Sequence, residues 1–215
     1  MKKIIYLVGN KKFKQEPFEP FSLEVCKFLD IFSKRLSALK EIKKYPDLKS
    51  LSFWCRKKNI LKLKKEEKDL NFKIGLGLVF HITPSNVPTN FAYSLIFGLL
   101  SGNSNVIKVP SRKFKQIEII CKILKKLLLK FSFLKGRITI VRYQDNDEFT
   151  SKLSYLCNAR VIWGGDKTIN SIRNHKIQER AIELSFADRY SFCIMDTNKI
   201  MKLNNLEINN LVHNF

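Results

Sequence analysis

The stretch from Gly75 to Arg112 places the strongest constraint on the fold of this chain. No Asp, Glu, Lys or Arg lies between Lys73 and Lys108, although the 215 residues include 40 lysines and arginines. Residues 77–82, GLVFHI, form an apolar run that is typical of a strand covered on both faces. A buried strand is therefore expected at the start of the stretch.

A polar turn, a helix and a second strand are expected after this run. The prolines of residues 83–88, TPSNVP, interrupt the strand because each fixes φ and favours an extended residue before it. Ser85 or Asn86 is expected to cap the next helix, with Pro88 in its first turn. Residues 105–109 then form a short β-branched strand. The expected core residues of the helix are Phe91, Leu95, Ile96 and Leu99, and its expected end is at Gly102 and Asn103.

This β–α–β unit places a polar turn at the carboxyl end of its first strand. Ligands bind at that end in open parallel sheets. Thr83, Ser85 and Asn86 supply polar groups there, just before a helix N-terminus that favours anions. The pair Gly75 and Gly77 lacks a third glycine and precedes the strand, so it is not the usual dinucleotide fingerprint.

The remainder of the chain alternates helices with strands. Helices are expected at 111–131, 147–157 and 168–175, and strands at 137–143, 160–163 and 182–195, the last broken near 187–188. Before residue 70 the sequence predicts a short strand at 2–9, a helix capped by Ser22 and ended by Pro46, and another helix at 50–63. The alternation predicts an α/β fold with a parallel sheet. We therefore expect a mostly helical segment at 1–70 and an α/β domain at 71–215.

The composition is globular but strongly basic, with a formal net charge of +21. Such an excess raises the question of nucleic acid or an anionic membrane. The lysines are scattered, and the chain is also rich in Ile, Asn and Phe, whose codons are A/T-rich, so biased base composition is the favoured explanation. The apolar run at 91–100 is about ten residues, short of the ~20 that span a bilayer. We expect a cytoplasmic protein with no membrane span, and a nucleic-acid-binding protein stays as an alternative.

The five cysteines are widely spaced and form no CxxC pair. An odd number of separated cysteines indicates free thiols and no zinc or other metal site. Cys193 is expected in the core, and Cys157 lies at a helix end. His81 and His175 are expected to be packing or surface residues.

Residues 82–88 (ITPSNVP) and 98–112 (GLLSGNSNVIKVPSR) resemble the cofactor-binding segment of the aldehyde dehydrogenase superfamily. The wording HITPSNVPTNF is most similar to the LuxC family of fatty acyl-CoA reductases, which supply aldehyde for bacterial luminescence. The resemblance covers about residues 70–215. It implies an aldehyde dehydrogenase-like, Rossmann-type parallel sheet flanked by helices. It also implies an NADPH-dependent reductase that converts fatty acyl-CoA to aldehyde and CoA.

The resemblance assigns two catalytic residues. Asn86 matches the amide that stabilises the oxyanion of a thiohemiacetal, a task for a fixed neutral donor. Glu183, in IELSF, matches the general base in Leu-Glu-Leu-Gly-Gly of oxidising members, although Ser185 and Phe186 replace both glycines. A glutamate among apolar neighbours has a raised pKa if it is buried. The alternative for Glu183 is a salt bridge with one of the lysines.

The resemblance also implies how the cofactor is held. Lys108 matches the lysine that binds the adenine-ribose hydroxyls. Arg112 stands near the acid of the family pattern Lys-Pro-Ser-Glu, and an arginine can pair with a 2′-phosphate, so NADP(H) is expected over NAD(H). Asp166 departs from the family's Thr-Gly-Ser turn over the pyrophosphate and could instead cap a helix. The other residues assigned to the cofactor are Thr83, Pro84, Ser85, Ser111, Gly164 and Gly165.

The family's nucleophilic cysteine follows the glutamate after a helix, and residues 205–215 look like the beginning of that helix. None of the five cysteines matches that position. We therefore expect an N-terminal, cofactor-binding portion that binds nucleotide at best when alone. The alternatives are a non-catalytic remnant or one half of a split enzyme with a separately encoded C-terminal half. Other expected partners are an acyl-CoA or acyl-protein donor, an acyl-protein synthetase and, at full length, further copies of the chain.

Overall fold

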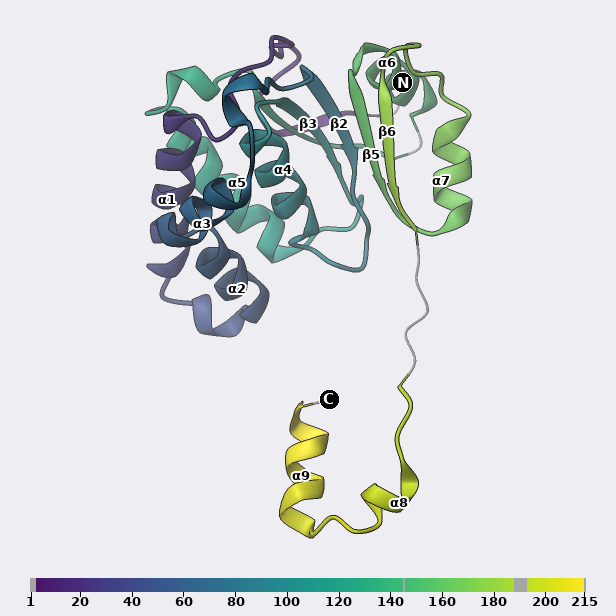
Figure 1. The fold of residues 1–215 in the computed structure, drawn as a ribbon. Helices are drawn as coiled ribbons and strands as arrows, with labels where there is room; N and C mark the ends of the chain where they lie inside the picture. Colours follow the sequence, from purple (N-terminus) through teal and green to yellow (C-terminus); the bar gives the residue numbers. More distant parts are fainter. Residues whose placement is uncertain (1–2, 145, 188–192, 215) are drawn as a thin grey trace.

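The computed structural model describes residues 3–144, 146–187 and 193–214. Its centre is a six-stranded sheet with the order β1-β4-β3-β2-β5-β6 (Figure 1). Strands β2 to β6 run parallel to their neighbours, and β1 pairs with β4 in the antiparallel direction. The strands are β1 (Ile5–Val8), β2 (Leu78–Ile82), β3 (Ser104–Val109), β4 (Ile138–Arg142), β5 (Ala159–Trp163) and β6 (Ile182–Phe186). The predicted α/β class with a parallel sheet is confirmed.

The strand expected at residues 77–82 is β2, and all five of its residues are buried. The helix that follows, α4 (Asn90–Leu100), begins later than the sequence predicts. Neither Ser85 nor Asn86 caps it, because Pro88 and Thr89 first form a turn and Thr89 is the N-cap, with the Asn90 amide donating to the Val87 carbonyl at 3.2 Å. The predicted core residues of α4 are all at most 2% exposed: Phe91, Leu95, Ile96 and Leu99.

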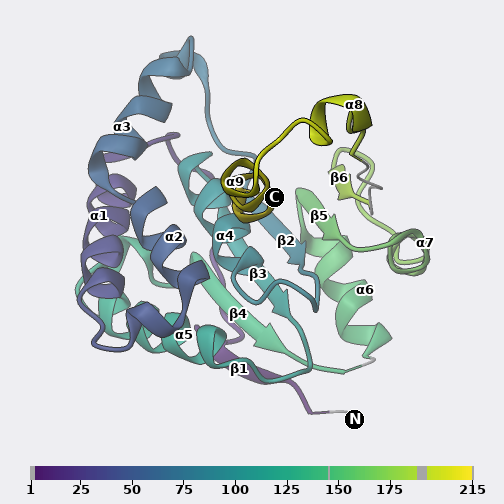
Figure 2. The same ribbon diagram turned by 90° about the horizontal axis from the view of Figure 1, so that it is seen from below.

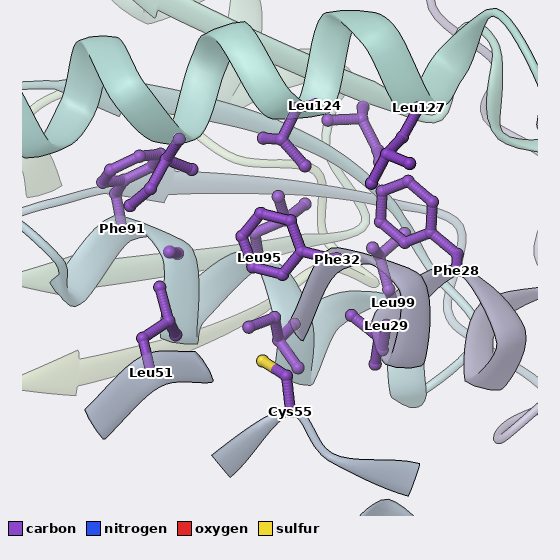
Figure 3. Packing of buried hydrophobic residues seen from close by; sticks show 14 of the residues in the cluster. Phe28, Leu29, Phe32, Leu51, Cys55, Phe91, Leu95, Leu99, Leu124 and Leu127 are labelled. Atoms are coloured by element: carbon purple, nitrogen blue, oxygen red, sulfur yellow. The ribbon is translucent and has the colours of Figure 1, made fainter. Parts of the chain in front are cut away.

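Helices cover the two faces of the sheet in separate layers (Figure 2). On one face α1 (Leu23–Ser37), α4 and α5 (Lys115–Leu128) enclose a large apolar cluster, part of which Figure 3 shows. On the other face α6 (Asp147–Leu156) and α7 (Asp166–Arg173) pack on a smaller cluster. Adjacent residues on a strand point to opposite faces, so Val106 belongs to the smaller cluster and Ile107 to the larger.

The N-terminal part is helical, as expected, but one predicted helix is two. Helices α2 (Pro46–Trp54) and α3 (Lys57–Glu66) replace the single helix expected at 50–63. They separate because Arg56 is extended, and Pro46 begins α2 at its first turn instead of ending α1. Strand β1 pairs with β4, and α1 shares the large cluster with α4 and α5. The domain boundary at residue 70 stays a prediction.

Most later elements match their predicted positions, but α5 begins later than predicted and β6 is shorter. Ser111 does not cap that helix; its hydroxyl donates to the Tyr143 carbonyl at 3.3 Å, and α5 begins at Lys115. The short 3₁₀ helices are η1 (Ile42–Lys44), η2 (Leu70–Phe72) and η3 (Ser132–Leu134). Figure 1 shows α8 (Thr197–Ile200) and α9 (Asn205–Asn214) apart from the sheet and its helices. None of the helices in the described part of the chain is long and apolar enough to cross a membrane.

Strand β6 lies at the edge of the sheet and leaves one of its faces open. Ile182, Leu184 and Phe186 are 45%, 51% and 43% exposed. The Phe186 ring stacks on Trp163 of β5, with the ring centroids 3.9 Å apart. An extended stretch is predicted at 182–195, but the strand ends at Phe186. Residues 188–192 lie outside the described residues.

Candidate functional site

A cleft of about 300 Å³ opens between α6 and α7, beside the carboxyl ends of β3 and β4. That volume is at the lower end of the range for small-molecule sites. Lys108 and Tyr143 enter it from the sheet, and the helices supply the other walls. The lining residues are Lys108, Tyr143, Asn146, Asp147, Thr150, Lys167, Thr168, Ser171, Ile172 and His175.

Lys108 and Tyr143 form the floor of this cleft. The Lys108 ammonium lies 5.0 Å from the centroid of the Tyr143 ring, within the range of a cation–π contact. The Tyr143 hydroxyl hydrogen-bonds the Thr150 hydroxyl at 3.0 Å. Burial raises the pKa of Tyr143 to about 12, against the opposite effect of that hydrogen bond, so the phenol is neutral. The floor of the cleft therefore carries the positive charge of Lys108 above the neutral ring of Tyr143.

The glycine turn after β5 leads directly into the cleft wall. The N-cap of α7 is Gly165, and Asp166 is its first helical residue, so Asp166 is not the cap. A Cβ on Gly164 would lie 3.1 Å from the Thr168 side chain, so a glycine allows this close approach. Lys167 and Thr168 then line the cleft. Gly164 and Gly165 themselves are not among the lining residues; the helix that they precede is.

His175 also lines the cleft. Its Nδ1 lies 2.7 Å from the Ser151 hydroxyl, and its Nε2 lies 3.9 Å from a carboxylate oxygen of Asp147. The Asp147 side chain is 92% exposed. His175 is therefore a wall residue of the cleft, in addition to the packing or surface role expected for it.

Glu183 lies behind the cleft wall in an ion pair with two arginines. Its Oε2 accepts from Arg160, whose side chain is 3% exposed, and its Oε1 accepts from Arg173 at 2.7 Å. Burial acts to raise the pKa of Glu183, but the hydrogen bonds and charges of Arg173 and Arg160 outweigh it and lower that pKa. The expected raised pKa is therefore wrong, and the partners are arginines instead of lysines.

The turn after β2 reaches the same edge of the sheet, because Ile82 lies opposite Lys108 in the parallel register. Thr83 is 8% exposed, and its hydroxyl donates to the Lys108 carbonyl at 2.9 Å. Pro84 is half-buried, whereas Ser85 and Asn86 are exposed. These turn residues are not among those that line the cleft.

Ser111 and Arg112, which follow β3, are not among the residues that line the cleft. The Arg112 guanidinium lies 5.0 Å from the centroid of the Phe114 ring, and Arg112 is exposed. Ser111 is held by the Tyr143 carbonyl. Of the sequence-predicted residues, the structure thus brings Lys108 together with the helix that follows Gly164 and Gly165.

Sequence reasoning missed Tyr143, Lys167 and His175 as cleft residues. Tyr143 directly follows β4, so the rule that places ligands at the carboxyl edge could have found it. Lys167 follows the glycine turn and was obtainable in the same way. No sequence signal marks His175, because its place depends on how α7 packs beside α6.

The described cysteines offer no matching nucleophile inside the cleft. Burial raises the pKa of Cys55 and Cys121 to about 12 and that of Cys157 to about 11, which disfavours their thiolates. Cys193, expected in the core, is exposed. Ile194 and Met195, which follow it, are 85% and 43% exposed, so this part of the predicted strand does not enter the core. Within residues 3–144, 146–187 and 193–214, no group of three His, Cys, Asp or Glu is placed to hold a metal ion.

A second polar group lies on the opposite face of the sheet, under α4. His81 is 2% exposed; its Nδ1 lies 2.8 Å from the Ser94 hydroxyl and its Nε2 lies 2.9 Å from the Asn105 amide oxygen. Trp163 donates to the same Ser94 hydroxyl at 3.3 Å. Burial lowers the pKa of His81 to about 4, against the Asn105 hydrogen bond, so the ring is neutral and structural.

Comparison with known protein families gives one match, which covers most of the chain. The family described as acyl-CoA reductase (LuxC) matches residues 45–214. None of the curated proteins compared with the chain matches it.

Solved structures share the fold at low identity. PnpE from Pseudomonas sp. WBC-3 is 16% identical, with a TM-score of 0.52, and the match covers 76% of this chain and 38% of that one. A betaine aldehyde dehydrogenase from Staphylococcus aureus, solved with NAD+, is 17% identical, with a TM-score of 0.53, and the match covers 76% and 37%. A mutant of Proline Utilization A from Bradyrhizobium japonicum is 15% identical, with a TM-score of 0.57, and the match covers 76% and 20%. The chain therefore has an aldehyde dehydrogenase-like fold, and it matches less than two fifths of each of these proteins.

Proposed function

Because the chain belongs to the LuxC family of acyl-CoA reductases, we propose that its cleft binds the nicotinamide dinucleotide of such a reductase. The observation that supports the proposal is that Lys108 at the end of β3 lines one cleft with Lys167 and Thr168 in the first turn of α7. Parallel sheets bind ligands at this edge, and helix N-termini favour phosphate groups. The uncharged hydroxyls of Thr168 and Ser171 add hydrogen-bonding groups.

The reaction proposed for the complete enzyme is reduction of a fatty acyl-CoA. The acyl group passes from CoA to a cysteine thiolate, and the cofactor supplies the hydride that releases the aldehyde and NADP+. Asn86 is proposed to donate its amide to the oxyanion, and its exposure after β2 leaves the side chain accessible for that role. The cysteine is proposed to come from outside this chain, as in a longer product or a separately encoded half.

The cofactor is proposed to be NADP(H). Lys108 and Lys167 place two cations in the cleft, against one exposed carboxylate from Asp147. Arg112 stands at the end of β3 without an acid beside it in sequence, where an acid would repel a 2′-phosphate. The Arg112 guanidinium lies on the Phe114 ring at the surface, a contact that the proposed pairing would replace.

Equilibrium titration of the purified chain with NADPH and NADH tests this function without any need for turnover. We expect NADPH to bind more tightly, and Lys108→Ala to raise both dissociation constants about tenfold, which corresponds to 1.4 kcal/mol. Arg112→Glu should weaken NADPH and spare NADH. Lys126→Ala, on the exposed side of α5, is the matched control and should change neither.

Three outcomes would contradict the proposal. Binding of neither nucleotide by the wild-type chain would refute the site, and equal weakening of both nucleotides by Arg112→Glu would refute the NADP(H) assignment. Binding of nucleic acid with a steep salt dependence, unaffected by NADPH, would favour the alternative raised by the charge of +21.

A further inference from the structure

Arg160 is a buried cation that ties its own strand to three other elements. It lies on β5 and is 2% exposed. Its Nε and one terminal nitrogen donate to Oε2 of Glu183 on β6, at 2.9 Å and 2.5 Å. A guanidinium in such a place is unfavourable unless an anion pairs with it, and Glu183 is that anion.

The other terminal nitrogen of Arg160 fastens the wall of the cleft. It donates to the Ile172 carbonyl at 3.1 Å and to the His175 carbonyl at 2.6 Å, both at the C-terminal end of α7. It also donates to the Ser154 hydroxyl on α6 at 3.1 Å. Ile172 and His175 both line the cleft, so one side chain fixes the outer wall with respect to the sheet.

Both oxygens of Glu183 are engaged in these pairs. Oε2 accepts from Arg160, and Oε1 accepts from Arg173 at 2.7 Å. Glu183 is not among the residues that line the cleft. A general base must lie within hydrogen-bond reach of the proton that it takes, and this carboxylate instead faces two guanidinium groups.

We propose that Glu183 is a positioning residue, which holds Arg160 in place and through it the α7 wall of the nucleotide cleft, and that it is not a proton-transfer base. The proposal rests on the nucleotide-binding function proposed above. Without the carboxylate, the buried guanidinium has no anion, and it releases the carbonyls of Ile172 and His175 when it turns towards water. The cleft then loses the fixed geometry that its ligand needs.

A double-mutant cycle on nucleotide binding tests this role. We expect Glu183→Gln and Arg160→Gln each to raise the dissociation constant of NADPH by about tenfold or more, because a displaced wall no longer holds the ligand in a fixed geometry. The double variant should be no weaker than either single variant, because both remove one shared interaction. A base role predicts unchanged NADPH affinity for Glu183→Gln and no coupling to Arg160.

Arg173→Gln is the matched control. Arg173 pairs with the other oxygen of the same carboxylate, but its side chain is 53% exposed and the cleft wall does not depend on it for a carbonyl contact. We expect the NADPH affinity of this variant to stay within about twofold of wild type, as for exposed ion pairs. A tenfold loss in Arg173→Gln with none in Arg160→Gln would overturn the proposal.

Arg160→Lys keeps the test decisive if Glu183→Gln does not fold. The lysine keeps a cation for Glu183, but its single nitrogen cannot serve the carboxylate and both carbonyls in the geometry of the guanidinium. We expect this variant to fold and to bind NADPH about tenfold more weakly. A folded Arg160→Lys protein with unchanged affinity would overturn the proposal. A wild-type chain that binds neither nucleotide would refute the cleft itself, which is a different failure.

Discussion

The two faces of the sheet differ in what their side chains do. Under α1, α4 and α5 the packing is apolar, and a cavity of only about 10 Å³ remains among residues such as Phe28, Leu95 and Ile120. Under α6 and α7 there is an open cleft with lysines at its walls and a buried arginine behind it. The same strands supply both faces, so alternation along each strand separates the residues that stabilise the fold from those that can bind a ligand.

Truncation of the apolar face should give the largest effect. Phe28 is 1% exposed and packs against Phe32 and Phe131. Phe28→Ala should lower the free energy of unfolding by about 3–5 kcal/mol, since it leaves a cavity in a closely packed core. Urea denaturation measures the loss. Phe72→Ala is the control, because Phe72 is 92% exposed and should change stability by less than about 0.5 kcal/mol. Similar losses at both positions would contradict the assigned core.

Acid should lower the free energy of unfolding through the polar network of His81 under α4. The folded pKa of His81 is about 4, below the ordinary value of about 6.5, so the unfolded chain binds the proton more readily. The stabilisation is complete above pH ~6.5 and declines as pH falls towards 4, with a loss of about 2 kcal/mol at pH 5. His81→Gln should show a smaller difference in unfolding free energy between pH 7 and pH 5. His213→Gln, at an exposed site, should keep the wild-type difference, and equal pH dependence in both variants would refute the assignment.

Loss of a hydroxyl on the polar face should lower the free energy of unfolding by less than either change above. Tyr143→Phe removes the hydrogen bond to Thr150 but keeps the ring beneath Lys108. We expect a loss of about 1 kcal/mol in the free energy of unfolding, with nucleotide affinity preserved. Thermal denaturation with parallel NADPH titration checks both. Tyr155→Phe, at a side chain that is 57% exposed, should have no effect, and a large loss of affinity in Tyr143→Phe would mean that the hydroxyl itself contacts the ligand.

The smallest effect is expected from an exposed ion pair outside both faces. Lys34 pairs with Asp30 on α1 at 2.7 Å, and its side chain is 72% exposed. Lys34→Ala should lower the free energy of unfolding by about 0.3–0.5 kcal/mol at low salt and by less at high salt. Denaturation at two salt concentrations measures this. A loss of unfolding free energy as large as that of Phe28→Ala would contradict the expectation that buried residues stabilise the fold more than exposed ion pairs.

Local patterns predicted the elements well and their caps less well. The charge-free run gave β2, α4 and β3, because burial on both faces leaves an unbroken apolar signal. Caps depend on the dihedral angles of single residues, so Ser85, Asn86 and Ser111 were misassigned. The break between α2 and α3 at Arg56 carries no glycine or proline and left no signal.

The site was predictable where a residue sits at a strand end and not where it depends on packing. Lys108 lines the cleft because it lies at the end of β3, where parallel strands share one edge, whereas Gly165 does not line it. The partners of Glu183 were not found, since the register that places Arg160 opposite it joins strands distant in sequence. Arg173 ends α7 and His175 follows it, so their positions depend on how α7 packs on the sheet.

The open flank of β6 has a consequence for handling the protein. An edge strand can pair its free backbone amides and carbonyls with another extended polypeptide. The exposed apolar side chains of Ile182, Leu184 and Phe186 favour such contacts here. Mutual repulsion between molecules of charge +21 keeps them dispersed in dilute buffer. Ions shorten the reach of that repulsion to about 8 Å at physiological strength. The purified protein should therefore self-associate as salt is added, with the exposed edge of β6 as the interface.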